Sequence, residues 1–150
     1  MPRFTQRNKA VAIESNAQFD TFRIVSNDPA PRVSLCLIAR NEEGDIEECI
    51  RSASGCVDEV IVADTGSTDR TREIAISVGA RIVEFPWCDD FAAARNASLQ
   101  AATGNWVLVL DADERLAKGA AEVIRQAVLD PKFIAYRLQV ISDVGAGNSH

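Results

Sequence analysis

The chain has 150 residues, which limits it to one domain or part of a larger one. Its hydrophobic content of 47% is enough for a core, and its net charge of −6 argues against a general nucleic-acid surface. A site for one bound nucleotide is still allowed. No apolar run approaches the ~20 residues of a membrane span, and no secretory signal is apparent. Cys36, Cys49, Cys56 and Cys88 form no C-x-x-C pair, so a reducing cytoplasm is the expected setting.

Residues 1–32 form a mixed, polar lead-in that ends in Asp28-Pro29-Ala30-Pro31. We expect this segment to be separate from the main domain and partly disordered. Its apolar residues Phe19, Phe22, Ile24 and Val25 are candidates for docking as a short strand or as an irregular clip. The main domain is expected to cover residues 33–150.

Apolar runs and amphipathic stretches alternate regularly from Val33 onward. Predicted helices begin at Asp45, after a turn over 65–69, at Phe91 and at Gly119. Predicted strands cover 33–38, 59–63, 81–85, 106–110 and 133–141. Strand–helix alternation with short links predicts right-handed βαβ units, and so an α/β fold with a mostly parallel sheet and flanking helices.

Ligands in such sheets bind at the carboxyl ends of the strands. This rule selects three polar segments. They are Ala39–Glu42 after the first strand, Asp64–Asp69 after the second and Asp111–Glu114 after the fourth. Because all three are rich in carboxylates, we expect them to form one site.

The acid pair Asp111 and Asp113 follows the run Val107–Leu110, which is typical of a strand buried on both faces. In extended backbone the two side chains project the same way. Two carboxylates about 5 Å apart repel by about 3 kcal/mol at an effective dielectric near 20, and a bound Mg²⁺ or Mn²⁺ would remove that cost. The alternative is that the pair forms a turn and helix cap, which is the commoner role of an isolated D-x-D.

Several nucleotide-binding and catalytic classes are excluded. The first turn, Ala39–Gly44, lacks G-x-G-x-x-G, and the chain has no G-x-x-x-x-G-K-[ST]. His150 is the only histidine, so Ser-His-Asp chemistry is not available inside the chain.

Two further residues are candidates for ligand contacts. Asp64 could accept hydrogen bonds from a ribose or base edge, or serve as a turn residue. Arg95 stands among small residues one turn into a helix, where it could reach a diphosphate; an ordinary salt-bridged arginine is the alternative. Asp89 and Asp90 are expected to cap that helix.

Four segments, in order, closely resemble family 2 glycosyltransferases of the GT-A fold, which is Rossmann-like. The bacterial lipopolysaccharide-core glucosyltransferase type and the tetratricopeptide-fused type are the most similar. The resemblance covers Val33 to about Ile141. The segments are Leu37–Glu43, Val62–Thr71, Asp90–Asn96 and Gly104–Glu114.

This resemblance implies a nucleoside-diphosphate sugar donor, most often a UDP-sugar, a divalent cation (Mg²⁺ or Mn²⁺), and transfer with inversion at the anomeric carbon. It assigns the metal to Asp113, with Asp111 beside it. The donor-binding residues that it implies are Ala39, Arg40, Asn41, Glu42, Asp64, Gly66, Arg95, Asp111 and Ala112.

The family domain continues well past this length, and its later part usually supplies the acceptor site and the general base. The chain therefore resembles a donor-binding half, with no residue matching the base and with a glycan, lipid or protein acceptor left open. Its location is expected to be cytoplasmic or peripheral to the inner face of the membrane. A family domain that is cut near residue 150 would expose an apolar sheet edge, which favours self-association.

Two other functions stay open at this point. A non-catalytic α/β interaction module would keep the fold without turnover, and it would bind a partner without nucleotide. Another metal-dependent phosphotransfer enzyme could use the same acid pair.

Overall fold

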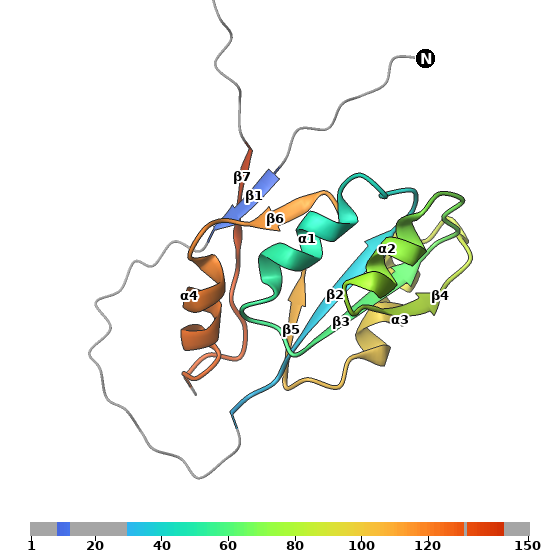
Figure 1. Ribbon diagram of the computed structural model, residues 1–150. Helices are drawn as coiled ribbons and strands as arrows, with labels where there is room; N and C mark the ends of the chain where they lie inside the picture. The colour runs from blue at the N-terminus through green and yellow to red at the C-terminus, as the bar shows by residue number, and fades with distance from the viewer. Residues whose placement is uncertain (1–8, 13–29, 131, 143–150) are drawn as a thin grey trace, which may run out of the picture.

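A computed structural model describes residues 9–12, 30–130 and 132–142 of the protein (Figure 1). The helices are α1 (Ile46–Ala53), α2 (Thr71–Ser77), α3 (Phe91–Ala101) and α4 (Ala120–Ala127). The strands are β1 (Lys9–Ala12), β2 (Val33–Ala39), β3 (Glu59–Asp64), β4 (Arg81–Glu84), β5 (Trp106–Val109), β6 (Glu114–Leu116) and β7 (Gln139–Ser142).

The main sheet has four parallel strands in the order β4-β3-β2-β5. The chain moves outward from β2 to β3 and β4, then returns to place β5 on the other side of β2. The direction in which successive strands are added therefore reverses at β2, which has β3 on one side and β5 on the other. Open α/β sheets bind ligands at the carboxyl ends of strands at such a reversal. The predicted α/β fold with a mostly parallel sheet and flanking helices is confirmed.

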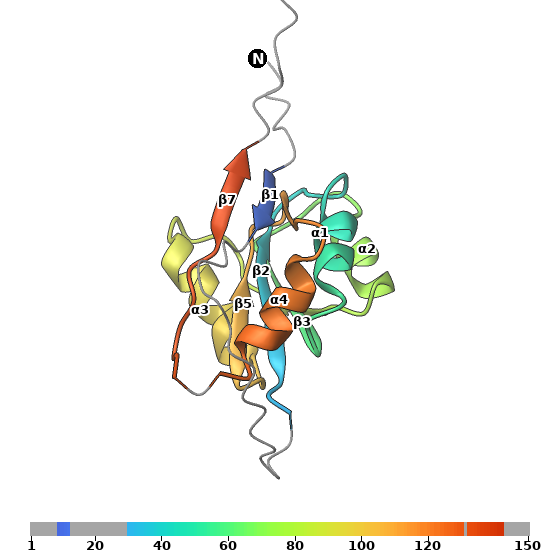
Figure 2. The same ribbon diagram turned by 90° about the vertical axis from the view of Figure 1, so that its left-hand side faces the viewer.

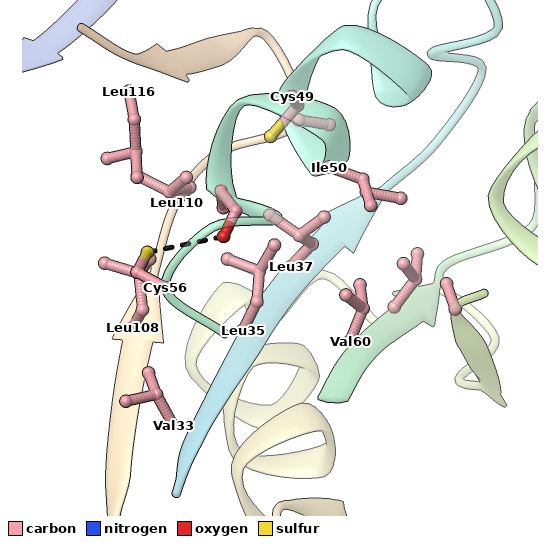
Figure 3. Close-up of a cluster of buried hydrophobic side chains, with 14 of the residues drawn as sticks. Val33, Leu35, Leu37, Cys49, Ile50, Cys56, Val60, Leu108, Leu110 and Leu116 are labelled. Atoms are coloured by element: carbon pink, nitrogen blue, oxygen red, sulfur yellow. Dashed lines mark hydrogen bonds between the residues drawn. The ribbon is translucent and has the colours of Figure 1, made fainter. Parts of the chain in front are cut away.

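One face of this sheet carries the main hydrophobic core (Figure 3). Alternate residues of β2 point to this face, so Val33, Leu35 and Leu37 are buried there. The apolar stripe of α1, including Cys49 and Ile50, packs over them, as the helical spacing predicts. Helix α4 adds further apolar side chains to the same core.

Helix α3 covers the opposite face and lies across the sheet from α1 and α2 (Figure 2). It packs on β2, β3 and β4, and the Cys36 thiol of β2 donates to the Ser98 carbonyl of α3 over 3.5 Å. Strand β5 extends beyond this cover, which leaves Val107 40% and Val109 43% exposed. The prediction that this strand is buried on both faces is therefore wrong, because only its α1 side is covered.

A second, three-stranded sheet has the order β6-β1-β7. Strands β1 and β6 were not predicted, because each gains its hydrogen bonds from a partner far away in sequence. The predicted strand over 133–141 is reduced to β7, and exposed residues precede it. The predicted docking of Phe19, Phe22, Ile24 and Val25 falls outside the described residues.

The four cysteines are free thiols, and Cys36, Cys49 and Cys56 are buried while Cys88 is exposed. Burial of the first two agrees with their prediction as small core residues. No helix within the described ranges has the length and apolar character needed to cross a membrane.

Candidate functional site

The acidic segment after β5 is a tight turn. The Glu114 amide donates to the Asp111 carbonyl over 2.9 Å, and the Asp111 amide donates to the Glu114 carboxylate over 2.8 Å. The expectation that Asp111 and Asp113 project together from extended backbone is therefore wrong, and the turn alternative describes the backbone correctly. Ala112 is buried in the core, so it anchors the turn while the acids on either side stay accessible.

Helix α3 delivers Arg95 to this turn. The Asp90 carboxylate accepts the Ala93 amide and caps the helix, as predicted. Asp89 does not cap the helix; it accepts the Trp87 indole N–H over 2.8 Å. Because α3 is rich in alanine, it packs closely on the sheet, and the Arg95 Nη2 reaches the Asp111 Oδ1 at 2.9 Å.

An open cleft of about 610 Å³ brings the strand ends together. Its volume lies within the range of small-molecule sites. Six of the predicted site residues line it, namely Arg40, Glu42, Arg95, Asp111, Ala112 and Asp113. The remaining lining residues are Ile38, Thr65, Trp87 and Phe91.

The cleft-lining loop after β2 is fixed to the loop after β3. The Glu42 amide donates to the Thr71 hydroxyl over 2.7 Å. Asn41 has a φ of 56°, which asparagine tolerates better than most residues, and its side-chain oxygen accepts the Thr68 amide over 2.8 Å. Asn41 therefore faces the neighbouring loop. Ala39 lies in the core below the cleft.

Asp64 is 2% exposed and bound within its own turn. Its carboxylate accepts the amides of Gly66 and Ser67, and the Arg72 Nε lies 2.9 Å from it. Gly66 has a φ of 107°, a conformation that glycine adopts readily. Neither Asp64 nor Gly66 lines the cleft, so the structure shows the turn role for Asp64, and a donor contact by these two residues stays a prediction.

The acids of the cleft influence one another. Burial, followed by the negative charges of Asp113 and Asp45, raises the pKa of the Glu42 carboxyl above its ordinary value.

Among the described residues, no three His, Cys, Asp or Glu side chains are already grouped to hold a metal ion. The donor set of carboxylates nevertheless suits a hard divalent cation completed by water and phosphate oxygens.

A polar atom is also left over at the same place. The Arg95 Nη1 is buried and has no hydrogen-bond partner within the part of the chain that the structure describes. A buried N–H group without a partner is costly, whereas an anionic oxygen in the cleft would satisfy it. The site thus combines carboxylates that attract a cation with a guanidinium that attracts an anion.

The sequence reasoning missed the aromatic residues Trp87 and Phe91. Their ring centroids lie 4.6 Å apart at 68°, an edge-to-face pair, and Phe91 is 72% exposed. The signal was present, since an aromatic pair at i and i+4 flanks the start of an alanine-rich helix. Trp87 and Phe91 carry no charged group, so the carboxylate pattern at the strand ends does not select them.

Most of the chain is similar in sequence to a known protein family. The family model described as glycosyl transferase family 2 matches residues 34–149. A TPR repeat-containing protein of Synechococcus elongatus is 48% identical over 105 residues, which are 70% of this chain and 26% of that protein. An uncharacterized glycosyltransferase of Rickettsia bellii is 34% identical over 113 residues, which are 73% of this chain and 38% of that protein.

A solved structure also shows similarity to the chain. Glucosyl-3-phosphoglycerate synthase from Mycobacterium tuberculosis, in complex with Mn²⁺, UDP and glucosyl-3-phosphoglycerate, is 40% identical with a TM-score of 0.48. The alignment covers 55% of this chain and 33% of that one. The chain spans between 26% and 38% of the length of the two curated relatives.

Proposed function

The chain belongs to glycosyl transferase family 2, and we propose on that basis that it forms the donor-binding half of an inverting glycosyltransferase. The donor would be a nucleoside-diphosphate sugar, with a UDP-sugar expected. The acceptor site and the general base would lie in sequence that corresponds to the longer part of the relatives.

One observation carries this proposal. Residues from the ends of β2 and β5 and from helix α3 line a single cleft at the point where the strand order reverses. This is where an open α/β sheet binds its ligand. The cleft offers the two kinds of group that a diphosphate bound through a cation requires, carboxylates at Asp111 and Asp113 and a guanidinium at Arg95.

The carboxylates of the cleft would bind the cation, and its arginines would bind the phosphates. Asp113, assisted by Asp111, would hold a Mg²⁺ or Mn²⁺ ion, which when bound would neutralise the diphosphate and act as a Lewis acid on the leaving group. Arg95 would donate to a phosphate oxygen, with the exposed Arg40 as a second cation on the cleft wall. Both arginines would stabilise the charge that develops on the departing nucleoside diphosphate.

The nucleobase would lie against the aromatic pair. Phe91 and Arg95 are four residues apart on α3, which places them about 6 Å apart along the helix axis. Both line the cleft. A base stacked on Phe91 would therefore lie within one nucleoside length of a phosphate held by Arg95.

The first test is calorimetry on the unmodified chain, with UDP titrated in the presence of Mn²⁺ and again in EDTA. The proposal predicts binding that requires the cation and that a simple phosphate monoester does not reproduce. Equal affinity for a phosphate monoester would favour a phosphotransfer enzyme. Binding of neither ligand would favour an interaction module that has the fold without the activity.

The edge of β5 supports a second proposal, that the chain self-associates. Val107 and Val109 are exposed there, beside an open apolar cavity of about 380 Å³ that Trp106 and Tyr136 help to line. Exposed apolar edge strands are sites of pairing between chains. Sedimentation velocity at increasing concentration is expected to show a growing larger species, and a constant monomer would reject this proposal.

A further inference from the structure

Arg115 of β6 is held in an unusually complete set of contacts. Its Nη2 lies 2.9 Å from Asp45 Oδ1, and its Nε lies 2.7 Å from Glu48 Oε2. Its Nη1 donates to the Asp113 carbonyl over 3.3 Å. The side chain is 15% exposed, so the guanidinium is largely removed from water. All three of its nitrogens are thus engaged.

These contacts join two loops on either side of the cleft. Asp45 ends the loop after β2, since its amide donates to the Glu42 carbonyl over 3.0 Å. Asp113 belongs to the acidic turn after β5. Arg115 therefore connects the Glu42 loop to the backbone of the predicted metal ligand, although Arg115 itself does not line the cleft.

Two uncharged contacts also fix this turn and β6 to helix α1. The Leu116 amide donates to the Ser52 hydroxyl over 2.9 Å, and the Cys49 thiol lies 3.4 Å from the Asp111 carbonyl as a weak donor. The acidic turn and the strand that follows it are therefore bound to helix α1 at Asp111 and at Leu116. Arg115 is the one charged contact among these, and the one that also reaches the loop after β2.

We propose that Arg115 is a positioning residue that holds the carboxylates of the acidic turn at the correct distance from the loop after β2, so that a cation-bound diphosphate fits between them. This inference rests on the proposed function. A planar guanidinium can span three oxygen acceptors in fixed directions, whereas a lysine ammonium acts as a point charge and cannot. Residues that orient metal ligands typically affect metal affinity 10- to 100-fold when they are replaced.

A purely electrostatic role of Arg115 predicts that the cation binds more tightly, not more weakly, when the positive charge is removed. Removing a positive charge near Asp113 would leave Asp45 and Glu48 unpaired and would attract a cation more strongly. Arg115→Met and Arg115→Lys separate the two roles. Positioning predicts that both variants bind Mn²⁺–UDP about tenfold more weakly than the unmodified chain. Electrostatics predicts tighter binding by the methionine variant and normal binding by the lysine variant.

The matched control is Arg125→Met. Arg125 pairs with Asp58 at 3.0 Å and is 30% exposed, but Asp58 binds the Val33 amide at the opposite end of β2. This control is expected to lose stability without losing affinity for Mn²⁺–UDP. Hydrogen exchange supplies a readout that needs no ligand, because the amides over 111–116 are expected to exchange faster in both Arg115 variants and unchanged in Arg125→Met.

The outcomes separate the inference from the function on which it rests. If the unmodified chain binds no UDP with Mn²⁺, the proposed function fails and the inference fails with it. If the unmodified chain binds and Arg115→Lys matches it, or if exchange over 111–116 is unchanged, the inference alone is overturned. Should Arg115→Met not fold, the lysine variant, which keeps the charge, still decides the question.

Discussion

The Arg95 guanidinium on α3 lies 2.9 Å from the Asp111 carboxylate that follows β5. This ion pair joins the helix on one face of the sheet to the acidic turn at its edge. It orients Arg95 through Nη2 while Nη1 stays buried without a partner among the described residues. The arginine is therefore held in place by one anion and left able to bind another.

Arg95→Lys is expected to weaken UDP binding 10- to 100-fold, because a hydrogen bond to a charged group contributes about 1.5–3 kcal/mol. A guanidinium can bind Asp111 and a phosphate at the same time through different nitrogens, whereas a lysine ammonium cannot reproduce this geometry. Calorimetry with UDP and Mn²⁺ measures the change. Arg81→Lys is the control, since Arg81 binds the Ala101 carbonyl outside the cleft. Unchanged affinity in the Arg95 variant would remove Arg95 from the donor site.

Phe91→Ala tests the aromatic part of the cleft. Stacking of a base on an aromatic ring contributes about 1–3 kcal/mol, so UDP affinity is expected to fall roughly 5- to 100-fold. Ile76→Ala is a matched control, because Ile76 is also exposed, at 59%, but lies on α2 outside the cleft. Equal affinities in the two variants would show that Phe91 does not contact the base.

Glu59 is expected to make the stability of the fold depend on acid. Burial alone would raise the pKa of this carboxyl, but hydrogen bonds from Ser34 and Thr103 outweigh burial and lower the pKa to about 2. A lowered pKa means that the carboxylate stabilises the folded chain above pH ~4.5, and that this contribution is lost as the pH falls toward about 2.

Glu59→Gln should therefore lower the free energy of unfolding at pH 7 by up to about 3 kcal/mol. The difference from the unmodified chain should shrink to almost nothing near pH 2. Urea unfolding across this range measures it. Glu73→Gln serves as the comparison, because Glu73 pairs with Arg70 on the surface, where water screens the charges. A constant difference at all pH values would contradict the assignment.

The thiols should differ sharply in reactivity. Burial raises the pKa of Cys49 to about 12 and that of Cys56 to about 11, and Cys36 is also buried, whereas Cys88 is exposed. A thiol reagent at pH 8 is therefore expected to label Cys88 alone in the folded chain and all four cysteines in urea. Rapid labelling of Cys49 under native conditions would mean that helix α1 does not cover the core as described.

Much of the fold follows from local patterns in the sequence. Strands β2 and β3 can be predicted because burial on both faces requires a continuous apolar run. Helix α1 can be predicted because burial of one helical face spaces its apolar residues at the helical period. Strands β1 and β6 cannot be predicted in this way, because β1 forms by pairing with β6 and β7, and β6 forms by pairing with β1, all far apart in sequence. The exposure of Val107 likewise depends on where α3 ends across the sheet, which no local pattern records.

The residues of the site could also be predicted only in part from the sequence. Arg40, Glu42 and Asp113 were predicted because they follow strands, and the strand-end rule applies wherever the sheet is parallel. Asp64 and Asn41 follow strands as well, but their side chains hydrogen-bond the neighbouring backbone. Sequence position alone cannot distinguish a side chain that enters the cleft from one that supports the loop.

The most direct test of the donor site is the affinity of Asp113→Asn for UDP with and without Mn²⁺, beside Asp130→Asn as a control. Asp130 accepts the Lys132 amide beyond α4, away from the cleft. The proposed function predicts that Mn²⁺ strengthens UDP binding by the unmodified chain and by the control, and that this strengthening is lost in Asp113→Asn. Equal strengthening in all three proteins would contradict the assignment of Asp113 as the metal ligand.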